Sequence, residues 1–197
     1  VLAERRPDCL VAQGDTTTVM AAALAAFYRR IPFVHVEAGL RTGNLQAPWP
    51  EELNRRIAGL AAALHCAPTG RAADNLLREG VAPETVQVTG NTVIDALLWT
   101  VERERGRDRP WREKYAAIGD RRMVLITGHR RENFGGGMEQ ICAAVARLAE
   151  KFPAVEFLYP VHLNPRVREP VGRLLAGLPN VRLCEPAPYP EFVWLMD

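Results

Sequence analysis

The sequence has 197 residues, of which 48% are hydrophobic and 24% charged, so its composition suits a globular core and argues against disorder. Its 25 basic and 23 acidic residues leave a formal net charge of +2, which gives no electrostatic reason to expect a nucleic acid or a membrane as partner. The four cysteines are far apart and form no C-x-x-C pair, which fits reduced thiols: Cys9, Cys66, Cys142 and Cys184. No stretch resembles a membrane span or a signal peptide, so we expect a cytoplasmic protein.

Short apolar runs alternate along the chain with segments of helical period, a pattern that predicts an α/β fold with a parallel sheet covered by helices. The apolar runs are short enough to be strands buried on both faces. The predicted strands are residues 9–13, 33–37, 65–68, 86–89, 123–127, 155–159 and 181–184. The predicted helices are residues 16–30, 51–64, 70–79, 92–104, 137–152, 165–177 and one that opens near Pro190.

Both ends of the sequence indicate an internal fragment. The chain begins without Met and stops at FVWLMD, inside an apolar pattern of helical period. We expect this last helix to expose Phe192, Trp194, Leu195 and Met196.

Residues 101–122 form the only highly charged stretch and interrupt the apolar rhythm. This segment is the best candidate for a crossing between two domains. The alternative is a solvated helix face and surface loop within one domain.

Polar clusters follow three predicted strands, at residues 14–18 (GDTTT), 35–43 (HVEAGLRTG) and 127–133 (TGHRREN). Ligands bind at the carboxyl ends of the strands in open α/β sheets, so these clusters are candidate site residues. Asp15 either caps the following helix or takes part in chemistry, and the helix amides beside it suit a diphosphate.

Carboxylates dominate the second cluster and the loop that follows it. Glu37 ends the run FVHV, beside open space left by Ala38 and Gly39, and its partly desolvated carboxylate suits a general acid or base. The alternative is an ion pair with Arg41 or with a nearby helix. Glu51 opens the next helix, where acidic residues commonly complement the helix dipole. The alternative is a catalytic role, because a further carboxylate near Glu37 would let one site hold both an acid and a base.

His129 and Arg130 precede the glycines at 135–137 that open the next predicted helix, which suits contact with a phosphate. His162 ends another predicted strand, where a lone histidine is usually structural. No histidines and carboxylates have the spacing of metal ligands, so we assign no metal.

Seven runs, in this order, closely resemble the bacterial non-hydrolysing UDP-N-acetylglucosamine 2-epimerases: QGDTTT, HVEAGLRTG, PWPEELNRR, TGNTVIDALLW, TGHRREN, YPVHLNP and FVWLM. They span nearly the whole chain. The resemblance implies two Rossmann-like lobes of a GT-B-like fold, both incomplete here. Residues 1–100 would belong to the first lobe, 101–121 to the crossing and 122–197 to the second lobe.

The reaction that this resemblance implies is epimerisation at C2 of UDP-N-acetylglucosamine to UDP-N-acetylmannosamine, by elimination of UDP and re-addition through a glycal. It needs no redox cofactor. The resemblance also implies a homodimer, a role in cell-envelope polysaccharide biosynthesis, and UDP-N-acetylglucosamine and UDP as ligands.

By the same resemblance, Asp15, Glu37 and Glu51 match the family's catalytic carboxylates, and His129 matches a catalytic histidine near the diphosphate. Substrate contacts are implied for His129, Arg130 and, near the uracil, Phe192. Arg130 and His162 match positions linked in some members to a second, activating substrate molecule. The chain departs from the family at Ala187, where members often carry Gln, which puts one uridine contact in question. The family's N-terminal basic residues and its Asp-Ser-Gly-Gly stretch are also absent.

Two other function classes share these features. A GT-B-type glycosyltransferase would use the same fold and a UDP-sugar, but would not need three carboxylates at one sugar carbon. A catalytically inactive UDP-sugar-binding protein would not need Asp15, Glu37, Glu51 and His129 together. Relatives that hydrolyse the nucleotide sugar, or act on modified UDP-sugars, are not separated by the sequence.

Overall fold

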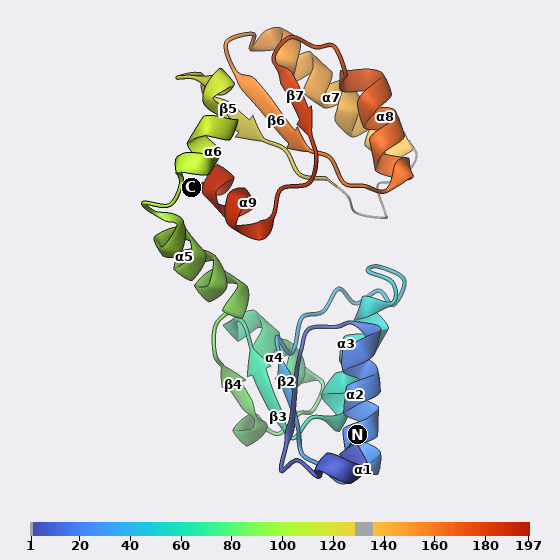
Figure 1. Cartoon of the computed structure of the whole chain (residues 1–197). Coiled ribbons are helices and arrows are strands. Elements are labelled where there is room, and N and C mark those ends of the chain that lie inside the picture. The colour runs from blue at the N-terminus through green and yellow to red at the C-terminus, as the bar shows by residue number, and fades with distance from the viewer. Residues whose placement is uncertain (1, 129–135) are drawn as a thin grey trace. The chain divides into compact units, whose positions relative to one another are not determined.

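The computed structural model describes residues 2–128 and 136–197, and these divide into two compact units, Val1–Asp95 and Ala96–Asp197. Each unit holds one parallel sheet with helices packed on it (Figure 1). The division falls inside helix α5 (Thr92–Glu104). The α/β fold predicted from the sequence is therefore confirmed in both units.

Four parallel strands form the sheet of the first unit, in the order β1-β2-β3-β4. Its elements are α1 (Leu2–Arg5), β1 (Leu10–Gln13), α2 (Thr17–Tyr28), β2 (Phe33–Val36), α3 (Glu51–Ala61), β3 (Leu64–Ala67), α4 (Gly70–Arg78), the 3-10 turn η1 (Pro83–Thr85) and β4 (Val86–Val88). Gln13 pairs with Val36, so β1 and β2 end side by side. Residues that follow these two strands therefore meet at one edge of the sheet.

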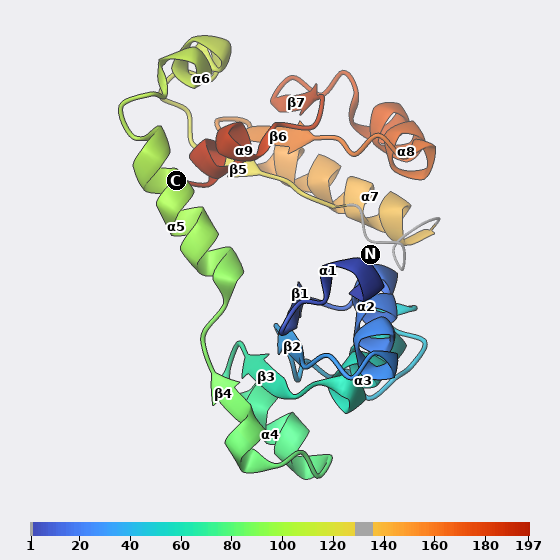
Figure 2. The same ribbon diagram turned by 60° about the horizontal axis from the view of Figure 1, so that its bottom comes forward.

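Small side chains let helices α2 and α3 pack closely in the first unit (Figure 2). Ala23 and Ala26 of α2 are buried against Phe33 of β2 and Ala58 of α3. Val11 is 60% exposed on β1 and Val88 is 58% exposed on β4. The prediction that every strand is buried on both faces is thus wrong for these two strands of the chain.

Three parallel strands form the sheet of the second unit, in the order β5-β6-β7. Its elements are α6 (Arg109–Lys114), the 3-10 turn η2 (Ala116–Ile118), β5 (Met123–Leu125), α7 (Gly136–Lys151), β6 (Glu156–Pro160), α8 (Pro165–Leu175), β7 (Val181–Cys184) and α9 (Tyr189–Met196). The central strand β6 carries Leu158 and Tyr159, which are fully buried. No helix in the described parts of the chain is long and apolar enough to cross a membrane.

The charged stretch of residues 101–122 contains α6 and η2, and it packs within the second unit. Tyr115 and Ile118 are buried with Leu195 of α9, and the Tyr115 ring stacks on Trp194 with centroids 5.9 Å apart. The expected exposure of Leu195 is therefore wrong, because this stretch covers it, and Phe192 and Trp194 are only half-buried. Met196 is 46% exposed, as expected.

Candidate active site

A tight turn at residues 14 and 15 connects β1 to helix α2. Gly14 has φ +88°, a left-handed conformation that glycine adopts without strain, and its N–H donates to the Val36 carbonyl at 3.0 Å. The residue that caps α2 is Thr16, whose hydroxyl accepts from the Val19 N–H at 3.3 Å. The interpretation of Asp15 as the cap is therefore wrong, and its carboxylate is used elsewhere.

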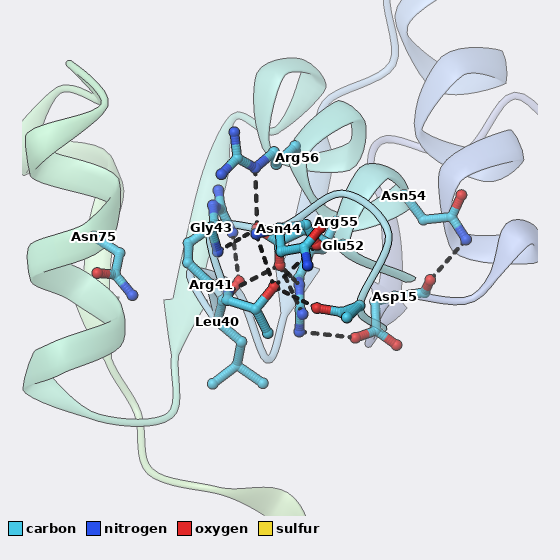
Figure 3. A network of polar contacts seen from close by, with 12 residues as sticks. Asp15, Leu40, Arg41, Gly43, Asn44, Glu52, Asn54, Arg55, Arg56 and Asn75 are labelled. Atoms are coloured by element: carbon cyan, nitrogen blue, oxygen red, sulfur yellow. Dashed lines mark hydrogen bonds and ion pairs between the residues drawn. The ribbon is translucent and has the colours of Figure 1, made fainter. Parts of the chain in front are cut away.

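Helix α3 supplies two contacts that hold Asp15 (Figure 3). The Asn54 amide donates to the Asp15 backbone carbonyl at 2.9 Å, and the Arg55 guanidinium donates to Asp15 Oδ2 at 3.2 Å. The Asp15 side chain keeps 30% of its surface exposed. Its carboxylate is thus fixed from one side and still open to a ligand.

Glu37 lies directly after β2, beside the Gly14 turn. It has φ +66°, a left-handed conformation that is uncommon for a side chain other than glycine. Its Oε2 lies 3.7 Å from the position that a Cβ on Gly14 would occupy. The pairing of β1 with β2 therefore brings Glu37 next to the turn that carries Asp15.

Two details predicted for the surroundings of Glu37 are wrong. Ala38 is fully buried, and a Cβ on Gly39 would lie 2.2 Å from the backbone oxygen of Ala72, so α4 fills the space expected to be open. Arg41 pairs with Glu79 of α4, with two N–H···O contacts of 2.8 Å, in place of the alternative pair with Glu37.

Glu51 is the first residue of α3 and is half-buried. Helical spacing of three and four residues places it on the same face as Asn54 and Arg55, which contact Asp15. Glu51 therefore lies on the side of α3 turned toward Asp15. Its position in the first helical turn also complements the helix dipole, so both predicted roles of Glu51 stay open.

Glu52 is a buried carboxylate that the sequence did not single out as a separate site. It accepts from the Thr42 N–H at 3.0 Å, from the Gly43 N–H at 3.3 Å, and from the guanidinium groups of Arg55 and Arg56. Burial opposes its ionisation, but the Thr42 N–H and the two arginines outweigh burial and lower the pKa of Glu52 to about 2. The only sequence signal is the arginine pair at spacings of three and four residues.

His35 begins the candidate cluster of residues 35–43, but sequence reasoning gave it no role of its own. Its imidazole is 1% exposed, and Nε2 lies 2.8 Å from the Gly14 carbonyl oxygen. Burial lowers the pKa of His35, and the bond to Gly14 only partly opposes this effect. A histidine inside the apolar run FVHV gave no indication of this bond, because the run predicts only a strand.

The predicted site residues of the second unit are only partly described. His129 and Arg130 lie outside the described residues. His162 is exposed after β6, and its Nδ1 accepts from the Asn164 N–H at 3.1 Å. Phe192 is half-buried on α9, three residues after the exposed Tyr189 and therefore on the same helix face.

A metal cluster and a hollow in the first unit are two other kinds of site that the described residues could form. No group of three or more His, Cys, Asp or Glu side chains among residues 2–128 and 136–197 could hold a metal. A hollow of about 550 Å³ lies between α3 and α4, lined by residues that include Arg41, Arg56 and His65. Its lining includes none of the three predicted catalytic carboxylates.

The family model described as UDP-N-acetylglucosamine 2-epimerase matches residues 1–197, which is the whole chain. The chain belongs to the UDP-N-acetylglucosamine 2-epimerase family. A probable UDP-N-acetylglucosamine 2-epimerase of Ralstonia nicotianae is 55% identical, and the UDP-N-acetylglucosamine 2-epimerase of Escherichia coli K12 is 52% identical, each over all of this chain. The chain spans 54% of the length of either relative.

Solved structures of this epimerase family have the same fold. The UDP-GlcNAc 2-epimerase of Neisseria meningitidis, bound to UDP-GlcNAc, is 47% identical with a TM-score of 0.96, and the match covers 99% of this chain and 53% of that one. The S. aureus MnaA structure with UDP is 42% identical with a TM-score of 0.89, over 99% of this chain and 51% of that one. The resemblance and the GT-B-like fold predicted from the sequence are confirmed.

Proposed function

We propose that this protein epimerises C2 of UDP-N-acetylglucosamine and forms UDP-N-acetylmannosamine. The observation that carries the proposal is the meeting of Glu37 with the Gly14–Asp15 turn at the ends of two paired strands. Membership of the epimerase family supports it, as do the named ligands of its relatives, UDP-GlcNAc in the Neisseria structure and UDP in the S. aureus structure.

The reaction consists of an elimination followed by an addition. A base takes the proton from C2 while the bond between C1 and the UDP oxygen breaks, which leaves a double bond between C1 and C2. A proton then returns to the opposite face of C2, and the UDP oxygen bonds to C1 again. Substrate and product have the same oxidation state, so the chemistry needs no redox cofactor.

We assign the proton transfers to the carboxylates Asp15, Glu37 and Glu51. Epimerisation needs one group on each face of C2, and carboxylates suit both removal and return of the proton. The Asp15 side chain is 30% exposed beside its contact with Arg55, and Glu37 Oε2 lies close to Gly14, the residue before Asp15. Glu51 would join them from the face of α3 that carries Arg55.

The second lobe would hold the nucleotide in this proposal. His129 and Arg130 would face the diphosphate, where positive charge stabilises the leaving group. Phe192 would pack on the uracil, which suits its half-exposed place on α9. Arg130 and His162 would contact a second, activating substrate molecule. We further propose a cytoplasmic homodimer with a first lobe at residues 1–100, a crossing at 101–121 and a second lobe at 122–197.

Proton exchange at C2 tests the proposed reaction. The natural full-length protein is incubated with UDP-N-acetylglucosamine alone in D₂O, and NMR follows deuterium at C2 and the appearance of the manno product. An epimerase incorporates deuterium at C2 without an acceptor. A glycosyltransferase or an inactive binding protein would show no exchange, and that result would refute the proposal. Release of the free sugar would indicate a hydrolysing relative.

A further inference from the structure

Arg55 connects two carboxylates that have different surroundings. Its Nε and Nη2 groups contact Glu52 Oε2 at 2.9 and 2.8 Å, while Nη1 donates to Asp15 Oδ2 at 3.2 Å. The Arg55 side chain is only 8% exposed and Glu52 is fully buried, whereas Asp15 is 30% exposed. One guanidinium thus joins a buried anchor to a carboxylate that a ligand can reach.

Arg56 offers a direct comparison within the same helix. It also pairs with Glu52, through Nε and Oε1 at 3.1 Å, but its side chain is 39% exposed. Figure 3 shows a dashed contact from Arg55, and not from Arg56, to Asp15. The two arginines therefore share one partner and differ in their contact with the candidate catalytic residue.

Glu52 also holds the loop of residues 42–50, which leads from β2 to Glu51. The Thr42 and Gly43 N–H groups donate to its two carboxylate oxygens. Because Arg55 binds the same carboxylate, the start of this loop and the Asp15 side chain are fixed to one buried centre. A shift of Arg55 would change the position of Asp15 relative to the loop.

We infer that Arg55 is a positioning residue that sets the orientation of the Asp15 carboxylate, with Glu52 as its buried anchor. The inference rests on the proposed epimerase activity. Arg55 contacts Asp15 through Oδ2, so it fixes the carboxylate plane without covering the exposed part of the side chain. Catalytic groups lose rate steeply when they are displaced by about 1 Å, so loss of this contact should lower kcat more than substrate affinity.

The test compares Arg55→Met with Arg56→Met in the natural full-length protein. Each variant removes one arginine from Glu52, but only Arg55→Met also removes the contact with Asp15. We expect Arg55→Met to lower kcat by about 100-fold with KM within about threefold of wild type. Arg56→Met should keep kcat within about threefold. UDP binding, measured by calorimetry, should stay within about threefold in both variants.

Two further variants separate positioning from folding. Arg55→Lys keeps a charged donor, so its kcat should be at least about tenfold higher than that of Arg55→Met. It should stay below that of wild type, because lysine lacks the planar fork that reaches two carboxylates. The double variant Glu52→Gln with Arg55→Met also removes the buried charge of Glu52, which in the single variant has lost one of its two arginine partners. Circular dichroism should show it folded, and its kcat should stay as low as that of Arg55→Met.

The outcomes distinguish this inference from the proposed function. If the wild-type protein shows no C2 exchange, the epimerase proposal fails and the inference fails with it. If the wild type is active and folded Arg55→Met keeps the same kcat as Arg56→Met, only the inference is overturned. A loss confined to KM, or a full recovery of kcat in the double variant, would equally overturn it.

Discussion

The imidazole of His35 donates from Nε2 to the carbonyl oxygen of Gly14 at 2.8 Å. A carbonyl can only accept, so Nε2 carries the hydrogen in this bond. The carbonyl belongs to the peptide that joins Gly14 to Asp15. A buried side chain of β2 therefore holds the orientation of the peptide that leads into Asp15. His35 Nδ1 has no hydrogen-bond partner despite its burial, so the bond to Gly14 is the polar contact that accounts for a histidine here.

This bond predicts different outcomes for two substitutions of His35. His35→Leu removes the donor and should lower kcat by about 10- to 100-fold, because the Gly14–Asp15 peptide loses one of its fixed contacts. His35→Gln offers an amide N–H at a similar distance and should keep kcat within about fivefold of wild type. Steady-state kinetics of C2 epimerisation checks both. Equal losses in two folded variants would show that the bond does not position Asp15.

Glu37 provides the most direct test of the carboxylate assignment. Glu37→Gln keeps the shape of the side chain but removes its ability to take or give a proton, so turnover and C2 exchange should fall by at least about 100-fold. UDP affinity should change little, because the diphosphate contacts are proposed for the other lobe. Unchanged turnover would contradict a catalytic role. The matched Glu79→Gln variant, which alters a carboxylate paired with Arg41 on α4, should keep most of the turnover.

The fold was largely predictable because its signals are local. Apolar runs predicted the seven strands of the described residues, with each end within two residues of its observed position. For β7 the predicted range 181–184 is the observed one. The helix α6 was missed because its charged, proline-containing sequence lacks an apolar period. The burial of Tyr115 beneath α9 was missed as well, because it depends on tertiary contacts.

The candidate site was predictable only where a residue follows a strand. Asp15 and Glu37 fit that rule because parallel strands end at one edge of the sheet. Arg55 and Glu52 lie inside a helix, where their sequence resembles an ordinary surface pattern of Glu with arginines three and four residues later. Their buried contacts are tertiary, from Glu52 to Thr42 and Gly43 and from Arg55 to Asp15, and no local pattern encodes them.

Two glycines give a matched test of how tightly α4 packs on the end of β2. Gly39 and Gly43 both have positive φ, +86° and +77°, so alanine at either position costs about 1–2 kcal/mol in backbone strain. A Cβ on Gly39 would also lie 2.2 Å from the Ala72 backbone oxygen, while Gly43 has open space. We expect Gly39→Ala to destabilise the protein by at least about 2 kcal/mol more than Gly43→Ala in urea unfolding. Equal effects would contradict this close packing.

The ionised state of Glu52 predicts how stability depends on pH. Its pKa is lowered from 4.5 to about 2, so its contribution to the free energy of unfolding is fully present above about pH 4.5 and is lost as the pH falls toward 2. A shift of this size corresponds to about 3 kcal/mol. Glu52→Gln lacks this titration, so its deficit relative to wild type should be largest at pH 6 and shrink by about that amount near pH 2.

Arg56→Met gives an intermediate case for the same measurement. Burial has the largest effect on the pKa of Glu52 and raises it, while the Thr42 N–H and Arg55 have the next largest effects and lower it. The Arg56 guanidinium also lowers this pKa. Its removal should narrow the pH range over which Glu52 stabilises the fold, because the carboxylate then takes up a proton at a higher pH. Urea unfolding of the three proteins at half-unit steps from pH 2 to 6 measures the effect. A stability difference between wild type and Glu52→Gln that stays constant across this range would show that Glu52 is not held ionised by its arginines.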